Sequence, residues 1–257
     1  MNVGSELFVG EDRNIQLKTV TFFCIDQRTG KMLWKDIELE EKWWVGIESI
    51  QGKVVFFHGF AKPDMPDHKK IYAYDLQTGK QLWYNSDITF LFSYGDLVYA
   101  SRDNASGIIF YEMNPLDGAI IREITDEEID DIHSVAVNVQ VEVRTFPETL
   151  HSDSQYYPEI RNINKIISNT DHYKELIEYI EMPKIFIVTY YTRSNTTTHP
   201  SDYHQEILIL DRKDKQTIYQ ARMNSNTKAL HPETYFVIDN YLYYIQEKTA
   251  LIAIMLP

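Results

Sequence analysis

The stretch KIYAYDLQTGKQLW, residues 70–83, decides the fold of this chain. Its first half alternates aromatic residues with aliphatic, small or acidic ones, a pattern typical of a β-strand. Gly79 can take the positive φ that a tight turn needs, and the side chains of Asp75 or Thr78 can bond nearby backbone amides. The chain then returns through residues 81–84. The stretch therefore predicts a short strand, a tight turn and a second strand.

Copies of this unit recur along the sequence. The closest is FFCIDQRTGKMLW at residues 22–34, which repeats the Asp, the Thr-Gly-Lys turn and the Trp. Trp34 and Trp83 stand ~50 residues apart, a period that suggests a propeller. Their equivalent positions predict that both indoles are buried between repeats. Weaker copies lie at Ile108–Ile121, Ile207–Tyr219 and Ala250–Leu256.

The repeated unit resembles the quinoprotein-like (PQQ-type) β-propeller repeat, in which a strand ending in Asp is followed by Thr-Gly-Lys and by a strand carrying Trp. The resemblance covers most of the chain outside about 146–183 and implies an all-β fold. It implies a small β-propeller of about five blades, or four if the terminal units merge, each a four-stranded antiparallel unit. Residues 42–48, KWWVGIE, also look similar to an uncharacterised bacterial family of small propeller-like proteins, which implies no activity.

A single domain is expected over residues 1–257, because one propeller of this length is normal. A helical insertion is predicted within it at about 146–183. One helix at about 158–167 would open at Pro158-Glu159, and a second at about 172–181 would carry an apolar stripe. So short a helix is stable only when packed, so we expect it to dock on the face with the Thr-Gly-Lys turns or to form an oligomer interface. The stripe consists of Tyr173, Leu176, Ile177 and Ile180.

Other segments bear on how the propeller is completed. Alternating valines predict a strand at Ser134–Val143, and the acidic run Asp126–Asp131 is interpreted as a solvated loop. Propellers usually close by pairing strands from both termini, which hides strand edges. We therefore expect Glu6–Val9 or Thr19–Asp26 to pair with the strands of Tyr241–Leu256.

Composition excludes several classes of protein. The 38 acidic and 25 basic residues give a net charge of −13, which repels phosphate backbones, so no nucleic-acid partner is expected. The single cysteine, Cys24, excludes an internal disulfide framework and is expected to be buried as a small hydrophobe. No signal peptide is visible, and no apolar run approaches the ~18 residues that span a bilayer, so we expect a cytoplasmic protein without a membrane partner.

The order of strands in a blade predicts where a binding site would lie. In a four-stranded meander, the loops after the second and fourth strands share one face, which would collect histidines and acids from different blades. A pocket there could bind a ligand. Alternatively, long polar loops simply contain histidine, and Trp43 and Trp44 simply pack between blades. The candidate ligand-binding residues are Arg13, Trp43, Trp44, Glu48, His58, Asp67, His68, His133 and His204.

No catalytic motif is visible, because a Gly-rich phosphate loop and a Gly-x-Ser-x-Gly nucleophile elbow are both missing, and the catalytic residues are unknown. The sequence therefore predicts a non-enzymatic soluble propeller that binds an unknown protein or small molecule or acts as a scaffold, with no cofactor and no metal. The alternative is a hydrolase acting on carbohydrate. Carboxylates such as Glu48 and Asp67 would then flank a glycosidic bond at the mouth of the channel.

Overall fold

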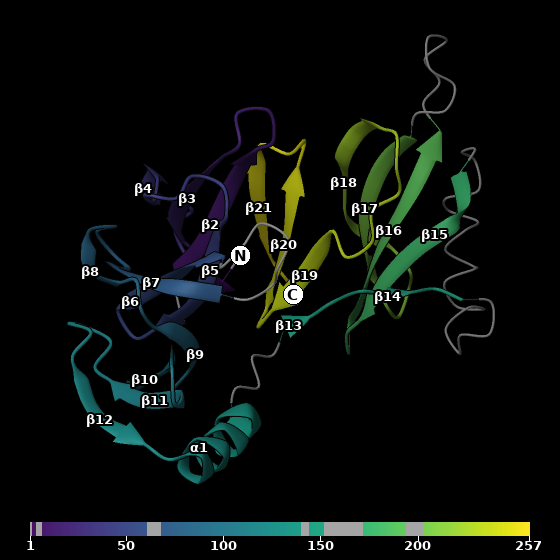
Figure 1. Ribbon diagram of the computed structural model, residues 1–257. Coiled ribbons are helices and arrows are strands. Elements are labelled where there is room, and N and C mark those ends of the chain that lie inside the picture. The colour runs from purple at the N-terminus through teal and green to yellow at the C-terminus, as the bar shows by residue number, and fades with distance from the viewer. Residues whose placement is uncertain (1, 4–6, 61–67, 140–143, 152–171, 194–202) are drawn as a thin grey trace. The chain divides into compact units, whose positions relative to one another are not determined.

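The chain is all-β, with its strands arranged in antiparallel meanders (Figure 1). The described residues form five sheets, four of four strands and one of five, together with one helix. These sheets are the blade units of a small β-propeller, so the predicted fold class is confirmed. The computed structural model describes residues 2–3, 7–60, 68–139, 144–151, 172–193 and 203–257.

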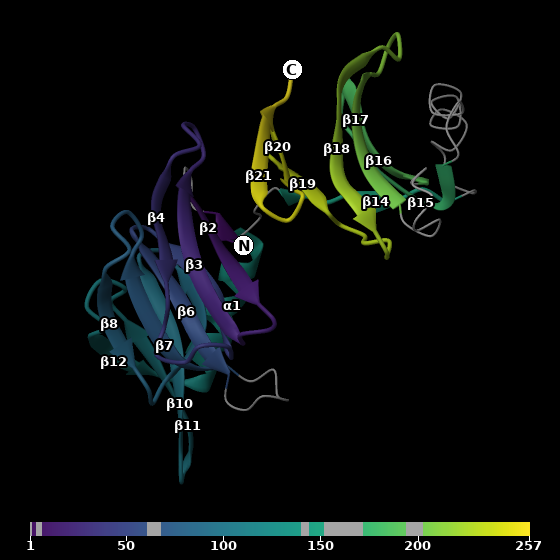
Figure 2. The ribbon, with the colours of Figure 1, turned by 90° about the horizontal axis from the view of Figure 1, so that it is seen from above.

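The chain divides into two compact units, residues 1–141 and 142–257. The prediction of one domain over the whole chain stays a prediction. The first unit holds three meanders and the helix (Figure 2). The first sheet contains β1 (Asn2–Val3), β2 (Leu7–Asn14), β3 (Thr19–Asp26) and β4 (Met32–Ile37). The second contains β5 (Val45–Gln51), β6 (Val54–Phe60), β7 (His68–Asp75) and β8 (Gln81–Asn85). The third contains β9 (Thr89–Tyr94), β10 (Leu97–Asn104), β11 (Gly107–Met113) and β12 (Ile120–Ile124), and α1 (Asp126–Val139) follows it.

The second sheet is covered on both faces. Successive side chains of a strand point to opposite sides, so neighbouring residues of β6 enter two different cores. Val55 and Phe57 of β6 belong to the core shared with the first sheet. Val54 and Phe56 point the other way, into the core shared with the third sheet. Cys24 lies in the former core, which confirms its predicted burial, and this burial raises the pKa of its thiol to about 12.

The hairpin between β7 and β8 has the predicted tight turn. The Oδ1 of Asp75 accepts a hydrogen bond from the backbone N–H of Thr78 at 2.7 Å, and the N–H of Gly79 donates to the Asp75 carbonyl at 2.9 Å. Gly79 has φ +67°, the left-handed region that favours glycine. The same backbone bond recurs from Gly30 to Asp26, from Gly118 to Asn114 and from Lys215 to Asp211.

The indole of Trp34 packs on this turn of the next sheet. Its Nε1–H donates to the carbonyl of Leu76 at 2.9 Å, and its side chain is buried. A Cβ atom placed on Gly79 would lie 2.8 Å from Cγ of Trp34, closer than such contacts allow. Gly79 is therefore required both for its φ and for the space that the indole occupies. The predicted burial of Trp34 between repeats is confirmed.

Trp83 repeats the contact one sheet further along. Its Nε1–H donates to the carbonyl of Pro115 at 2.8 Å, and a Cβ atom on Gly118 would lie 2.7 Å from Cδ2 of Trp83. Trp83 is partly buried, so its prediction is confirmed less fully than that of Trp34. Two successive sheets are thus joined to their neighbours by the same pairing of indole and glycine.

The strand predicted at Ser134–Val143 is wrong where the structure describes it, because residues up to 139 belong to α1. The acidic run predicted as a loop forms the first turns of this helix. Thr125 and Glu128 make a capping box: the Glu128 amide donates to Thr125 Oγ1 at 3.2 Å, and the Thr125 amide donates to Glu128 Oε2 at 2.9 Å. Acidic side chains near a helix N-terminus also interact favourably with its dipole.

Helix α1 packs on the third sheet through a few side chains. Ile129 is buried against Tyr99 and Ile124, whereas Val135 and Val137 are exposed. Val135 and Val137, whose alternation predicted one face of a strand, therefore lie on the exposed side of a helix. Among the described residues, no helix is long and apolar enough to cross a membrane.

The second unit holds the remaining two sheets. The five-stranded sheet contains β14 (Glu148–Thr149), β15 (His172–Glu181), β16 (Ile185–Arg193), β17 (Tyr203–Asp211) and β18 (Thr217–Thr227). The last sheet contains β13 (Arg144–Thr145), β19 (Tyr235–Ile238), β20 (Tyr241–Gln246) and β21 (Ala250–Met255).

The helix predicted at about 172–181 is wrong, because this segment is strand β15. Ile177 is buried in a cluster on one face of the sheet and Ile180 in a cluster on the other. A strand that is apolar on both faces can imitate the spacing of a helical stripe. The helix predicted at about 158–167 lies outside the described residues, and the oligomer expected through the insertion stays a prediction.

The expected pairing of the two termini is wrong in the described residues. Both edges of β2 are occupied within the first sheet, by β1 and β3, and both edges of β3 are occupied by β2 and β4. The last sheet instead takes its fourth strand from β13, where Arg144 pairs with Ile238 and Thr145 with Val237. A segment from the middle of the chain therefore supplies the fourth strand, at the β19 edge of this sheet rather than beside the strands of residues 241–256.

The contact between indole and glycine predicts a difference between two equivalent glycines. Gly30 and Gly79 share φ +67°, but nothing lies within 4 Å of a Cβ atom on Gly30. Gly30→Ala should lose about 1–2 kcal/mol of unfolding free energy from the left-handed backbone alone. Gly79→Ala should lose roughly 1–3 kcal/mol more, because both Trp34 and Ile37 must move. Urea unfolding followed by circular dichroism measures both, and equal losses would show that the indole contact does not hold the sheets.

Candidate functional site

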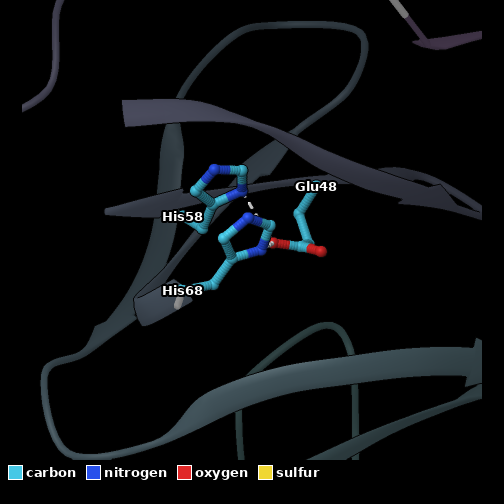
Figure 3. A group of neighbouring side chains, drawn as sticks. All are labelled: Glu48, His58 and His68. Carbon is cyan, nitrogen blue, oxygen red and sulfur yellow. Dashed lines mark hydrogen bonds and ion pairs between the residues drawn. The ribbon is translucent and has the colours of Figure 1, made fainter. Parts of the chain in front are cut away.

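Three of the predicted ligand-binding residues converge in the second sheet: Glu48 of β5, His58 of β6 and His68 of β7 (Figure 3). The Oε2 atom of Glu48 lies 2.7 Å from Nδ1 of His58 and 2.8 Å from Nδ1 of His68. The side chains of Glu48 and His58 are 14% and 7% exposed, and that of His68 is 34% exposed. One carboxylate oxygen therefore contacts two imidazoles at a largely buried position.

A β-bulge directs Glu48 into this cluster. Ile47 pairs with Phe57 and Ser49 pairs with Phe56, so Glu48 has no partner of its own on β6. Ile47 and Ile50 both pack against the core shared with the first sheet, although a regular strand would put residues three apart on opposite faces. Bulges change the direction of a side chain in this way and are common beside functional sites.

His58 lies on the face of β6 that Val54 and Phe56 also occupy, toward the third sheet. Its cross-strand neighbour is Gly46. A Cβ atom on Gly46 would lie 2.9 Å from both Cε1 and Nε2 of the imidazole. The absence of a side chain at residue 46 therefore makes the space in which the His58 ring is held.

A second irregularity brings His68 over His58. The pairing between β6 and β7 shifts after His58, so that His58 opposes Ile71 while Gly59 opposes Lys69. Lys70, the residue left over, has φ +65°. The hydroxyl of Thr89 on β9 donates to the His68 carbonyl at 3.3 Å, which ties this end of β7 to the third sheet.

The two imidazole rings are stacked. Their centroids are 3.6 Å apart and their planes differ by 8°. Figure 3 shows the two rings beside the Glu48 carboxylate. Phe60 stands edge-on to both rings, and its ring centroid is 4.9 Å from that of His58 and 5.4 Å from that of His68. Trp44 contacts Phe60 edge-on in turn, at 6.4 Å. The polar cluster therefore has an aromatic wall.

Stacking leaves His58 poorly satisfied. A ring N–H lies in the plane of its ring, and one oxygen atom close to both rings cannot lie in both of two stacked, nearly parallel planes whose ring centroids are 3.6 Å apart. Glu48 Oε2 makes an aligned hydrogen bond with Nδ1 of His68. Its contact with Nδ1 of His58 has the distance of an ion pair without that alignment, and in the described part of the chain neither ring nitrogen of His58 has a hydrogen-bond partner. Buried polar atoms are nearly always paired, so this exception calls for an explanation.

Arg13, Trp43 and Trp44 form a second group at the start of β5. The Arg13 guanidinium donates to the carbonyls of Trp43 and Val45 at 3.2 and 2.6 Å, and it lies 5.6 Å from the Trp43 ring centroid. Glu41 Oε1 accepts the backbone N–H groups of Trp43 and Trp44, which lowers the pKa of that carboxyl. Trp43 belongs to the edge of a core, and Trp44 is 37% exposed.

The remaining candidates do not join the cluster in the described residues. Asp67 lies outside the part of the chain that the structure describes. His133 is on α1, 5.0 Å from the ring of Phe92. His204 belongs to the second unit, where its Nδ1 accepts the Asn226 amide at 3.4 Å.

A buried carboxylate in the second unit, Glu178, was missed because its segment was predicted to be helical. Glu178 is 1% exposed and lies on β15. Its Oε1 accepts the Glu233 amide at 2.7 Å, and its Oε2 accepts the Thr189 hydroxyl at 3.4 Å. Burial raises its pKa, and the neighbouring Glu233 charge acts in the same direction. The sequence signal that could have identified it is its position: Glu178 stands directly between two apolar residues, Ile177 and Tyr179, in a segment that is apolar on both faces when read as a strand.

The N-terminal part of the chain matches a family of unknown function. Residues 2–83 match the domain of unknown function DUF4905. This match begins in β1 and ends in β8, and it includes Glu48, His58 and His68. It covers about a third of the chain. No curated protein matches the sequence.

Several solved structures are similar to the chain at low identity. BamB from Moraxella catarrhalis is 13% identical with a TM-score of 0.31, over 95% of this chain and 81% of that chain. The β-propeller domain of the Trilobed protease from Pyrococcus furiosus is 11% identical with a TM-score of 0.32, over 100% and 82%. An acylaminoacyl peptidase from Pyrococcus horikoshii is 9% identical with a TM-score of 0.32, over 99% of this chain but 37% of that chain. None of these similarities transfers an activity.

The raised pKa of Glu178 predicts a dependence of stability on pH. A group whose pKa is higher in the folded state contributes stability below its unfolded pKa, about 4.3 for Glu, and this contribution is lost as the pH rises through the folded value. Glu178→Gln keeps the neutral form at every pH. The difference in Tm, variant minus wild type, should therefore increase from pH 4 to pH 8. Glu181→Gln, on the same strand but paired with Arg212, should show no such gain. A constant difference across this range would contradict the assignment.

Proposed function

We propose that this protein is a non-enzymatic binding module and that Glu48, His58 and His68 form its ligand site. The observation that carries the proposal is the single oxygen of Glu48 in contact with two stacked imidazoles, one of them buried and without an aligned hydrogen bond. A polar group buried without a partner destabilises the fold, whereas a ligand that supplied the partner would relieve the penalty.

The position of the three residues supports this role. Each is on a strand of a sheet that is covered on both faces, and sites on strands are held more accurately than sites on loops. Two local irregularities, the bulge at Glu48 and the shift at Lys70, aim the side chains at one point. Glycine at residue 46 leaves room for the ring of His58.

The alternative, a glycoside hydrolase, has less support. Such enzymes use two carboxyl groups about 5–9.5 Å apart, one on each side of the bond that breaks. The described residues place one carboxylate in the cluster, and Asp67 lies outside them. A cleft of about 450 Å³ elsewhere in the first unit is lined by one carboxylate, Asp96, beside residues such as Lys53 and Asn114.

The repeats themselves are consistent with this proposal. We infer that the five sheets are quinoprotein-like units that serve as a frame, since the chain repeats the Asp and Thr-Gly-Lys turn without a catalytic motif. Quinone chemistry is not proposed, because the resemblance concerns the repeat alone. A cytoplasmic location completes the proposal, together with a ligand that is a small molecule, an ion or a protein.

A ligand panel tests the site. Sugars, carboxylates, phosphates and divalent cations would be screened by thermal unfolding with the wild type, Glu48→Gln and the control Glu112→Gln. Glu112 matches Glu48 in side-chain exposure, 14%, and is also ion-paired, with Arg122. At least one class should raise the Tm of the wild type and the control by about 5 °C at 100-fold excess over Kd, and not that of Glu48→Gln.

Two results would contradict the proposal. The first is that no class stabilises the wild type in a way that depends on Glu48. The second is that the wild type hydrolyses aryl glycosides and that Glu48→Gln abolishes the reaction. The second result would establish the hydrolase alternative instead.

A further inference from the structure

We propose that the ligand of the Glu48, His58 and His68 site is a divalent transition-metal ion of the zinc class. This inference rests on the proposed function and specifies the chemistry of the ligand. Two imidazole nitrogens and one carboxylate oxygen are the donor types that Zn²⁺ and related ions prefer. Three protein ligands also leave a coordination position open to water or to a further ligand.

The spacing of the donor atoms suits a metal ion. One ligand atom from each of the three residues lies within 4.8 Å of the others. Zinc bonds to nitrogen and oxygen are ~2.0–2.2 Å long, so two ligands at a tetrahedral angle are roughly 3.4 Å apart. The present contacts of Glu48 with His58 and His68, 2.7 and 2.8 Å, need to lengthen by only ~0.6–0.7 Å to reach that spacing.

Metal binding also requires the two imidazole planes to tilt, because each ring nitrogen points its lone pair within its own plane. The planes are now 8° apart. His58 is held by the close approach of Gly46 and is 7% exposed in its side chain, whereas His68 is 34% exposed. We therefore expect His68 to rotate and His58 to stay in place.

The buried imidazole of His58 is the second, independent observation. Within the described residues, neither of its ring nitrogens has a hydrogen-bond partner. Coordination would satisfy one nitrogen directly. Glu48 can then use its second oxygen, or the His68 ring its other nitrogen, for the outer contacts that orient metal ligands.

The surroundings fit an ion site better than a site for an extended organic ligand. Phe60 stands edge-on to both imidazoles, and Trp44 packs on Phe60. Val54 and Phe56 fill the same face of β6 below His58. An apolar wall of this kind excludes water and strengthens the attraction between a cation and the single carboxylate.

Cobalt titration of the full chain is the first test. After removal of metals with a chelator and dialysis, Co²⁺ would be added to the wild type and followed by visible absorption, and Zn²⁺ would be used to displace it. We expect one Co²⁺ per chain, d–d bands typical of nitrogen and oxygen ligands, and loss of these bands on addition of Zn²⁺. Imidazole resonances in ¹⁵N NMR should shift for two histidines of the eight in the sequence.

Variants locate the site. His68→Ala and Glu48→Gln should weaken Zn²⁺ binding at least tenfold by calorimetry, while His133→Ala, His204→Ala and Glu112→Gln should leave it unchanged. His68 is the most exposed of the three ligands, so its variants should keep the fold, and His68→Gln provides a second one. Circular dichroism would verify the fold of each variant.

The outcomes separate the metal from the binding function. Absence of saturable Co²⁺ and Zn²⁺ binding by the wild type would overturn the metal inference, as would binding that His68→Ala and Glu48→Gln leave intact. If an organic or anionic ligand nevertheless stabilises the wild type through Glu48, the proposed function stands without the metal. If neither kind of ligand binds through Glu48, both proposals fail.

Discussion

The packing of a tryptophan on the glycine of the next turn is the contact on which the first unit depends. The Trp34 indole occupies the space beside Gly79 and donates its N–H to Leu76, and Trp83 does the same one sheet further along, at Gly118. Each contact needs the left-handed turn residue, the missing Cβ and a free carbonyl together. The Trp of one copy and the turn glycine of the next are therefore the two halves of a single interaction between sheets, at Gly79 and again at Gly118.

The proposed ligand site follows from the resulting stack of sheets. With the second sheet covered on both sides, residues 54–59 of β6 are buried, and His58 is among them. Burial of an imidazole there is tolerable only because the bulge on β5 turns Glu48 toward it and the shift in β7 brings His68 over it. The regular strands form the sheet, and the two irregularities bring Glu48 and His68 to His58. Local irregularities of this kind are expected at functional sites.

The sequence predicted the frame well because turns and alternation are local signals. Asp75 and Gly79 specify their turn whatever surrounds them. Glu48, His58 and His68 were recognised as candidates, but their convergence was not, since bulges leave little trace in a single sequence. Predictions failed where the spacing of apolar residues fits both a helix and a strand. Strand β15 is apolar on both faces, and its spacing predicted a helix. The alternating valines of α1 predicted a strand, although those at 135 and 137 are exposed on a helix. The capping pair of Thr125 and Glu128 was the local signal that would have identified α1.

A comparison of buried carboxylates shows how Glu48 differs from the other buried acids. Glu178 accepts two donors, an amide and a hydroxyl, and Glu206 accepts the Nε–H of Arg222 at 2.9 Å. In both cases the chain supplies donors suited to the acid, and the contact is complete as a structural element. Glu48 instead divides one oxygen between two rings that cannot both align with it, so the same folding that satisfies the other acids leaves His58 unsatisfied. A cluster built only for stability would do better with an apolar residue at position 58. In the proposed site His58 is a metal ligand, and the metal ion would supply the partner that one of its ring nitrogens lacks within the described residues.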